Sequence, residues 1–251
     1  MESLHTLYAA PRDVRAIDDC YRYHTTDIPG HGRVEGEWDL TRDTASYLGG
    51  TNFRGARVLE VGPASGYLSF WMERAGAEVV SVDVADDFVF DVVPFAGADR
   101  RALSDGFVSA QRQVQNAYWF THSALRSRNR VHYGSGYRIP AELGRFDIGL
   151  LASVLLHNVN PVAMIDQVAQ RVQRRLIVAD LCHDEMPGCA LPTIQFYPSV
   201  GNGVWHTWWR FSEPFFVAVL KVLGFQIVTA SRSVQHYRGV PYTILTVVGE
   251  R

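Results

Sequence analysis

The chain has 251 residues, which is long for one compact domain but within the range of a single α/β domain with an N-terminal extension and a small insertion. Hydrophobic residues make up 47% and charged residues 20%, a globular composition that excludes a disordered or disulfide-scaffold chain. The formal charge is -2, from 24 basic and 26 acidic residues, and gives no general attraction to nucleic acid or to anionic membranes. We therefore expect one folded core and find no support for a nucleic-acid partner.

The cysteines are Cys20, Cys182 and Cys189, an odd number without a CxxC pair. They predict neither a disulfide framework nor a zinc module, and they fit a reducing compartment. The first 13 residues lack the apolar core of a signal peptide, and the apolar run at 148–156 is too short to span a bilayer. We expect a soluble, cytoplasmic protein.

Residues 1–54 predict a mostly helical cap or lid segment ahead of the main domain at 55–251. The middle of the cap, residues 23–39, is rich in glycine, histidine and acids and is bracketed by Tyr23 and Trp38. Such aromatic brackets favour an ordered loop over a flexible linker.

Short apolar runs alternate with helix-like segments from Ala56 onward. A run at 56–62, a helix over 67–75 and a second run at 78–84 predict a βαβ unit with a parallel sheet. The alternation continues with a helix over about 105–127, strands at 130–133 and 145–156, a helix from 161 to near 174, and a strand at 175–182. This regularity predicts a doubly wound α/β fold.

The last part of the chain departs from this alternation. A helix over 213–223 is opened by Ser212 and closed by Gly224. Two strands follow, at 225–231 and 242–249, close enough in sequence to pair antiparallel. We therefore expect a seven-stranded Rossmann-like sheet whose final pair is antiparallel.

A glycine-containing loop follows the first strand of the main domain. That strand ends at Gly62, and the chain turns through Pro63 and Ser65 into a helix at Gly66. Glycines allow the backbone to approach a ligand closely, and the helix N-terminus offers free N–H groups. The loop therefore predicts that these four residues bind a nucleotide-like ligand.

Two acids discriminate between nucleotide ligands. Asp83 ends the next strand, 21 residues after Gly62, the position from which a carboxylate accepts both hydroxyls of a ribose. Glu60 would repel the pyrophosphate of a dinucleotide but suits an ammonium group. S-adenosylmethionine carries both a ribose and an α-amino group, and the loop lacks the third glycine of the dinucleotide fingerprint. We therefore predict S-adenosylmethionine rather than NAD, bound by Glu60, Asp83 and the adjoining Val84.

The sequence resembles the class I S-adenosylmethionine-dependent methyltransferases. Within them it is similar to the branch that holds the tRNA wobble-uridine carboxymethyltransferases and many bacterial small-molecule methyltransferases. The resemblance covers most of the chain. Besides the glycine loop it rests on YHTTDIPG at 23–30, GEWD at 36–39, GRFDIGLLASVLLHNVNP at 144–161 and WWRFSEPFFVAVLKVLGF at 208–225.

The resemblance implies roles for particular residues. It implies that Asp83 binds the ribose and that Ala152 and Ser153, at the end of the fourth strand, line the cofactor. It also implies that the 23–39 segment folds over the cofactor, with Tyr23 among the residues in contact.

Three positions depart from the branch pattern. Glu37 stands where the carboxymethyl-transferring enzymes have a lysine that receives the carboxylate of their cofactor, and Leu156 stands where they have a tyrosine. The Gly134-Ser135-Gly136 loop lacks the acid that commonly contacts the adenine amino group, and Ser135 is an alternative contact. Since Glu37 would repel a carboxylated cofactor, the resemblance favours ordinary methyl transfer.

Histidines are the candidate catalytic residues. Methyl transfer is an in-line displacement that depends mainly on alignment, and a general base helps only where the acceptor loses a proton. His157 follows the fourth strand at the carboxyl edge, and His24 in the cap faces the same cleft in this interpretation. His157 as a structural loop residue is the alternative. The run Asp180 to Glu185 does not predict a metal site, because its side chains diverge along a strand and loop.

Aromatic residues are more numerous than one small core needs, and part of them lies in an expected insertion or lid at 182–211. Aromatic walls suit planar or apolar acceptors and attract a sulfonium. The candidates for the acceptor site are Trp119, Tyr197, His206 and Trp208.

Together these features predict a methyltransferase that acts on the oxygen, nitrogen or carbon of a small organic acceptor. The alternatives are a tRNA wobble-uridine modifying transferase, for which the arginines at 126–130 and 171–175 are the only basic clusters, and a nicotinamide-dependent oxidoreductase. The acceptor and the oligomeric state, a homodimer included, stay open.

Overall fold

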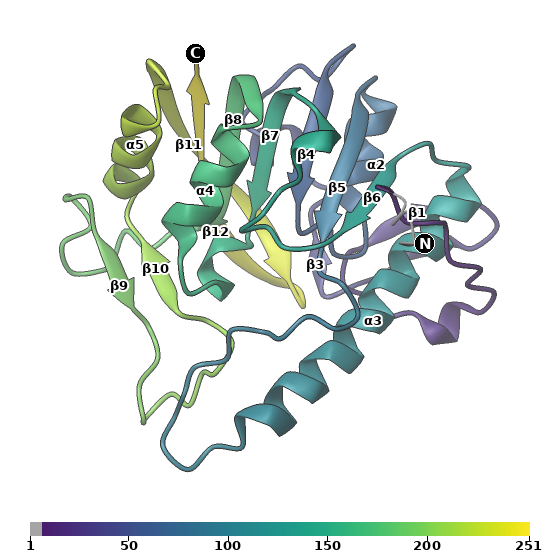
Figure 1. Ribbon diagram of the computed structural model, residues 1–251, viewed down its shortest axis with the longest axis horizontal. Helices are drawn as coiled ribbons and strands as arrows, with labels where there is room; N and C mark the ends of the chain where they lie inside the picture. Colours follow the sequence, from purple (N-terminus) through teal and green to yellow (C-terminus); the bar gives the residue numbers. More distant parts are fainter. Residues whose placement is uncertain (1–6) are drawn as a thin grey trace, which may run out of the picture.

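The computed structural model describes residues 7–251, so expectations for residues 1–6, in the opening segment and the cap, lie outside the described residues. The central sheet has the strands β3 (Trp38–Asp39), β4 (Arg57–Val61), β5 (Glu78–Asp83), β6 (Arg130–Tyr133), β7 (Phe146–Ala152), β8 (Val172–Leu181), β11 (Ile227–Tyr237) and β12 (Val240–Glu250). Their order is β3-β11-β12-β8-β7-β4-β5-β6 (Figure 1). Strands β6, β5, β4, β7 and β8 are parallel to one another. Strand β12 is antiparallel to β8, β11 to β12, and β3 to β11. The prediction of a doubly wound α/β sheet is confirmed, with one short edge strand added.

Helices cover both faces of this sheet. They are α1 (Thr44–Tyr47), α2 (Tyr67–Arg74), α3 (Arg100–Leu125), α4 (Pro161–Ala169) and α5 (Glu213–Val222), with 3-10 turns at Ile17–Asp19, Ala141–Leu143 and Leu155–His157. In Figure 1, α4 and α5 lie in front of the sheet and α2 lies behind it. Helix α3 runs below the sheet in this view, where the parallel strands have their carboxyl ends.

Successive residues of the strands pack on opposite faces. In β4, Leu59 belongs to the core that contains Ile165 of α4, whereas Val58 belongs to the core that contains Leu68 of α2. All four side chains are at most 4% exposed. Because both faces are buried, the strands are almost continuously apolar, and this is why the sequence predicted a parallel sheet.

Three helices begin after a residue whose side chain caps the first turn. Of these starts, the one after Ser212 was predicted, whereas α3 begins at Arg100 rather than near 105. Ser212 accepts the backbone N–H of Phe215, Asn160 accepts that of Ala163, and Asp99 accepts that of Ala102. The end of α4 is different, since the helix stops at Ala169 and β8 begins at Val172 rather than at 175. The early start is explained by pairing with β7, which local helical periodicity does not report.

The C-terminal hairpin is longer than expected. Strands β11 and β12 pair along their whole length, from Ile227 with Glu250 to Tyr237 with Val240. They are joined by Arg238 and Gly239, which both have positive φ (49° and 79°), the pattern of a two-residue type I′ turn. This turn was not identified in the sequence.

The prediction of a mostly helical cap is wrong for the described residues. Apart from the 3-10 turn and the four-residue α1, the cap has a hairpin of β1 (Thr26–Ile28) and β2 (Gly32–Val34) and the short strand β3. The rest of it consists of turns and loops. Trp38 and Asp39 add to the sheet by pairing with Tyr237 and His236. The cap is thus held by residues about 200 positions away, a contact that local propensity does not encode.

The insertion at 182–211 contains a small antiparallel pair, β9 (Ile194–Phe196) and β10 (Trp209–Phe211). Figure 1 shows this pair beside α4 and α5, away from β6. No helix within residues 7–251 is long and apolar enough to cross a membrane.

Candidate functional site at the carboxyl edge

The turn between β4 and α2 requires glycine at two positions. Gly62 and Gly66 have φ of 75° and 85°, in the left-handed region where a Cβ is strained. A Cβ at Gly66 would also lie 2.5 Å from the ring of Phe70 and 2.6 Å from that of Tyr118. The turn therefore packs closely on α2 and α3 and places the start of α2 at the carboxyl edge, where its first N–H groups can meet a ligand.

Glu60 lies directly under this turn and is 2% exposed. Its Oε2 accepts hydrogen bonds from the hydroxyls of Ser69 on α2 and Ser81 on β5. Burial raises the pKa of this carboxyl to about 7, although the two serines oppose the shift. The structure thus holds Oε2 of Glu60 on α2 and β5, and a contact of this carboxyl with a ligand ammonium group stays a prediction.

Asp83 ends β5 beside this turn, as expected. Its carboxyl is 7% exposed and accepts a hydrogen bond of 3.1 Å from Nε2 of Gln115 on α3. Gln111, one helical turn earlier, places its Nε2 3.4 Å from both carboxyl oxygens. Burial raises the pKa of Asp83 to about 6, while the N–H of Val84 and the two glutamines oppose the shift.

The cap contacts the glycine loop through His24. The backbone N–H of His24 donates to the Oγ of Ser65 over 3.0 Å, and the Oγ lies 3.0 Å from Nδ1 of the same residue. Since the Oγ proton is then available for Nδ1, the ring is held as the neutral tautomer protonated on Nε2. Burial lowers the pKa of His24 to about 3. Pro63 closes the loop below, where its carbonyl accepts the N–H of Gly66.

A hollow of about 330 Å³, counting space open to solvent, lies between the cap, the glycine loop and α3. Tyr23, His24 and Ser65 line one side of it, and Phe120 of α3 lines the other. Tyr23 is half-buried, and burial raises the pKa of its phenol to about 12. The structure therefore brings Tyr23 and His24 together with the glycine loop, as the sequence analysis expected.

The end of β7 lies next to the glycine turn, although its residues do not line this hollow. Ser153 has a φ of 50°, and its Oγ lies 3.2 Å from the hydroxyl of Tyr47. Its backbone N–H donates to the carbonyl of Ala179 on β8. Ala152 and Ser153 are both half-buried, and Val154 packs 3.1 Å from the position of a Cβ on Gly62. The chain thus leaves the sheet abruptly and lies against the glycine loop.

His157 stands at the end of the turn that follows β7. Its Nδ1 lies 2.6 Å from the backbone carbonyl oxygen of His206, so Nδ1 carries the proton and Nε2 is the acceptor. Burial lowers the pKa of His157 to about 4, and the hydrogen bond opposes the shift. The rings of His157 and His206 are 5.7 Å apart. The arrangement gives a neutral imidazole whose orientation is fixed by the insertion.

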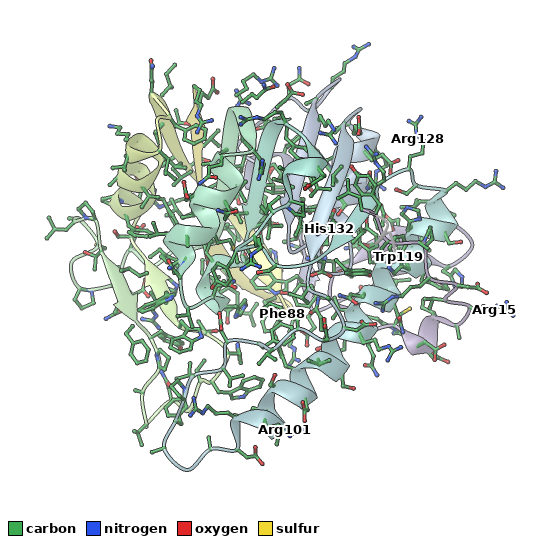
Figure 2. The ribbon with its side chains drawn as sticks, in the orientation of Figure 1. Arg15, Phe88, Arg101, Trp119, Arg128 and His132 are labelled. Carbon is green, nitrogen blue, oxygen red and sulfur yellow. The ribbon has the colours of Figure 1, made fainter. Side chains whose placement is uncertain are left out.

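Trp119 does not belong to this edge. It is 1% exposed, packs with Phe70, Tyr118 and Val131, and donates its Nε1–H to the hydroxyl of Tyr133. Figure 2 shows it on α3 inside the fold. The prediction that Trp119 lies in an acceptor site is therefore wrong, because its side chain is on a face of α3 that packs against α2 and β6.

The insertion and the segment after β5 pack on one another. The Nε1–H of Trp208 donates to the carbonyl of Asp91 over 2.6 Å, and the N–H of Val93 donates to the carbonyl of Trp205 over 2.8 Å. Phe107 of α3 joins this contact, with its ring 5.6 Å from that of Trp205. His206 follows Trp205 in the chain, and its ring lies 5.3 Å from that of Trp205.

Tyr197 belongs to the same insertion and is half-buried. Its ring is covered by the guanidinium of Arg210 at 4.2 Å, and its backbone N–H donates to the carbonyl of Trp208. Of the acceptor-site candidates, Trp208 contacts the segment after β5 and Tyr197 hydrogen-bonds the backbone of Trp208. His206 lies beside Trp205, which contacts the same segment.

The positions that depart from the branch pattern have structural partners. The carboxylate of Glu37 pairs with the guanidinium of Arg238 in the β11–β12 turn, so its charge is compensated. Ser135 accepts the N–H of Tyr137 with its Oγ in a tight turn after β6. Leu156 is 8% exposed and packs in the core with α4 and α5.

Gln111, Gln115 and Tyr47 were not singled out in the sequence. The two glutamines are four residues apart on the helix after β5, so they share a face. That spacing, next to an acid at the end of the preceding strand, was the available signal. Tyr47 carried no local signal, because its contact with Ser153 joins residues 106 positions apart.

No protein-family model matches the sequence, and no curated protein is significantly similar to it in sequence. Solved structures are similar in fold. Magnesium protoporphyrin IX methyltransferase from Synechocystis PCC 6803 with bound SAH matches with a TM-score of 0.51 and 18% identity, over 82% of this chain and 79% of that one.

Two further structures match to the same degree. The N-terminal domain of EvdMO1, in the presence of SAH and D-fucose, gives a TM-score of 0.52 and 17% identity over 93% of both chains. The 1,6-didemethyltoxoflavin-N1-methyltransferase from Burkholderia thailandensis gives 0.51 and 18% over 84% of this chain and 78% of that one. With the strand order of the central sheet, these likenesses show that the chain has the fold of the S-adenosylmethionine-dependent methyltransferases.

Proposed function

We propose that this protein is an S-adenosylmethionine-dependent methyltransferase that methylates a small organic acceptor. The observation that carries the proposal is the adjacency of the glycine turn and Asp83. The N–H of Gly62 donates to the carbonyl of Val82 over 2.9 Å, so the turn and the carboxylate leave the sheet side by side. Both stand at the carboxyl edge of neighbouring parallel strands, where ligands bind in such sheets.

The residues present fit the cofactor at this edge. The turn at Gly62 to Gly66 would receive the methionine part, and Asp83 would receive the ribose. Val84, Ala152 and Ser153 would line the adenosyl group, with Tyr23 and the cap above it. The two methyltransferase structures named above and EvdMO1 were each solved with SAH, which supports the same cofactor here.

When bound, the cofactor supplies an electrophilic methyl group on a sulfonium. The chain's own contribution is alignment and, for an acceptor that loses a proton, a base. His157 is the proposed base, because its Nδ1–H is fixed on the His206 carbonyl and its Nε2 is free to accept a proton. His24 serves as a positioning residue on Ser65 rather than as the base, since its Nδ1 is already engaged there.

An aromatic or apolar acceptor is favoured over a nucleic acid. The side chains of Trp205, His206 and Trp208 all belong to the insertion, and aromatic groups of this kind would suit a planar ring near a sulfonium. The arginine clusters are partly neutralised, since Arg130 pairs with Glu78 and Arg175 pairs with Glu250. Figure 2 shows Arg128 at the end of the molecule opposite to the carboxyl edge, which does not favour a tRNA surface around the site.

The test is transfer of a labelled methyl group from S-adenosylmethionine to two sets of acceptors. The first set contains planar small molecules with hydroxyl, amine or activated carbon groups, and the second is bulk unmodified tRNA. We expect label in the small-molecule set, lost in the His157→Asn variant, and none in tRNA. Label in tRNA alone would replace the acceptor class. Absence of cofactor binding in any mixture would overturn the proposed activity.

A further inference from the structure

A buried amide on α3 has one hydrogen-bonding group without a partner. Gln115 is 2% exposed, and its Nε2 donates to Oδ2 of Asp83 over 3.1 Å and to the carbonyl of Val84 over 2.9 Å. Both N–H groups are therefore used, whereas the Oε1 of the same amide is buried and accepts no hydrogen bond. A buried acceptor left in this way costs about 1–3 kcal/mol.

The amide cannot simply be turned over to remove this deficit. Exchanging its oxygen and nitrogen would bring Oε1 against the carboxylate of Asp83 and the carbonyl of Val84, which are both acceptors. The two donated hydrogen bonds thus fix which end of the amide is the oxygen. The missing partner must be a donor.

A ribose supplies two donors that are next to each other. The Oδ2 of Asp83 already accepts from Gln115, so Oδ1 is the carboxyl oxygen with the weaker protein contact, at 3.4 Å from Gln111. Oε1 of Gln115 belongs to the amide that hydrogen-bonds this same carboxyl, so the pair of side chains offers one acceptor each to a vicinal diol. Resting on the proposed function, we propose that Gln115 is a second ribose-binding residue, whose Oε1 accepts one hydroxyl of the adenosyl ribose while Asp83 accepts the other.

Gln111 is the matched comparison. It lies four residues from Gln115 on the same helix and also approaches Asp83, but its two contacts are each 3.4 Å long. Its side chain leaves no buried atom without a partner in the part of the chain that the structure describes. A change at Gln111 therefore alters the surroundings of Asp83 without removing the proposed hydroxyl acceptor.

The experiment is calorimetric titration of the full chain with S-adenosylhomocysteine and with its 2′-deoxy and 3′-deoxy analogues. The proteins are wild type, Gln115→Met and Gln111→Met, where methionine keeps the length of the side chain but offers no strong acceptor. Thermal melts of each variant check that the fold is retained. We expect Gln115→Met to weaken S-adenosylhomocysteine binding about tenfold. Gln111→Met, which removes only two 3.4 Å contacts with Asp83, should weaken binding less and by the same factor for all three ligands.

The deoxy analogues separate a direct contact from a structural one. If Oε1 accepts a hydroxyl, the analogue that lacks this hydroxyl binds wild type and Gln115→Met with equal affinity. The other analogue binds Gln115→Met more weakly than wild type, by the same factor as S-adenosylhomocysteine. Equal losses for all three ligands would mean that Gln115 acts only by supporting Asp83, which overturns the inference. Unchanged S-adenosylhomocysteine binding in Gln115→Met overturns it as well.

The proposed function fails in a different way. Wild-type protein that binds no S-adenosylhomocysteine overturns the methyltransferase proposal itself, whatever the variants do. Wild-type binding with no selective loss in Gln115→Met overturns only the role of Gln115.

Discussion

His24 in the cap and Ser65 in the glycine loop form a reciprocal pair. The backbone N–H of His24 donates to the Ser65 Oγ, and Nδ1 of His24 lies 3.0 Å from the same oxygen. One hydroxyl therefore joins two segments 41 residues apart, and one of them is the turn proposed to hold the methionine part of the cofactor. The position of the cap is coupled to the shape of that turn.

Ser65→Ala tests this coupling. The change removes the acceptor of the His24 N–H and the donor to Nδ1, two hydrogen bonds worth roughly 0.5–1.5 kcal/mol each. We expect S-adenosylhomocysteine affinity to fall between about 5-fold and 150-fold, measured by calorimetry. Ser123→Ala, at an exposed position on α3, is the control and should bind like wild type. Equal affinity in all three proteins would show that the cap does not depend on Ser65.

Asp83 makes cofactor binding depend on pH. Burial raises the pKa of this carboxyl to about 6, and the ionised form is the one that accepts ribose hydroxyls. We therefore expect S-adenosylhomocysteine affinity to be highest above pH 7 and to fall as the pH is lowered through 6. Calorimetry from pH 5 to 8 measures this, with Asp83→Asn as the variant that should lose the dependence. A dependence that survives in Asp83→Asn must come from another group.

Glu60 lowers the free energy of unfolding as the pH rises, whereas most acids in folded proteins raise it. Its pKa is raised to about 7 in the folded protein from 4.5, so the folded state holds a proton that the unfolded state has released between these values. Stability from this group is thus present below about pH 4.5 and is lost as the pH rises through 7. Relative to wild type, Glu60→Gln should gain on the order of 2 kcal/mol between pH 5 and 8.

Urea unfolding of wild type and Glu60→Gln at a series of pH values measures this difference. The amide retains an oxygen that can accept from Ser69 and Ser81, so the variant keeps the same partners. Parallel stability curves for the two proteins would contradict a raised pKa at Glu60.

His157 should affect turnover and not cofactor affinity. With an acceptor from the labelled-methyl screen that must lose a proton, His157→Asn should lower the single-turnover rate about 10²-fold to 10⁴-fold. The control is S-adenosylhomocysteine affinity, which should stay within twofold of wild type. A rate within threefold of wild type would assign His157 a structural role on the His206 carbonyl.

The sequence predicted the parts of the fold that depend on local pattern. Several features have their signal within a few residues of the chain. They are the strand that leads into Gly62, the helix from Tyr67, the helix N-cap at Ser212 and the acid Asp83 at a strand end. The predicted cofactor residues meet at one edge for the same reason, because parallel strands bring their carboxyl ends together.

The features that sequence reasoning missed depend on distant contacts. Trp38 pairs with Tyr237 in a strand that does not exist without β11, and a helical cap was expected in its place. The hydrogen bonds of Glu60 with Ser69 and Ser81 join residues 9 and 21 positions apart, and the sequence did not predict them. Trp119 shows the same limit, because aromatic content alone does not reveal which face of α3 is buried.

In the proposed function, the Asp83 carboxylate beside the glycine turn holds the ribose of an S-adenosyl ligand. Calorimetric titration with S-adenosylhomocysteine, in parallel with NAD, on wild type, Asp83→Ala and the exposed control Ser123→Ala tests it most directly. We predict that wild type and the control bind S-adenosylhomocysteine with the same affinity, that Asp83→Ala binds it at least tenfold more weakly, and that NAD does not bind. Binding of NAD alone, or equal S-adenosylhomocysteine affinity in Asp83→Ala, would contradict the claim.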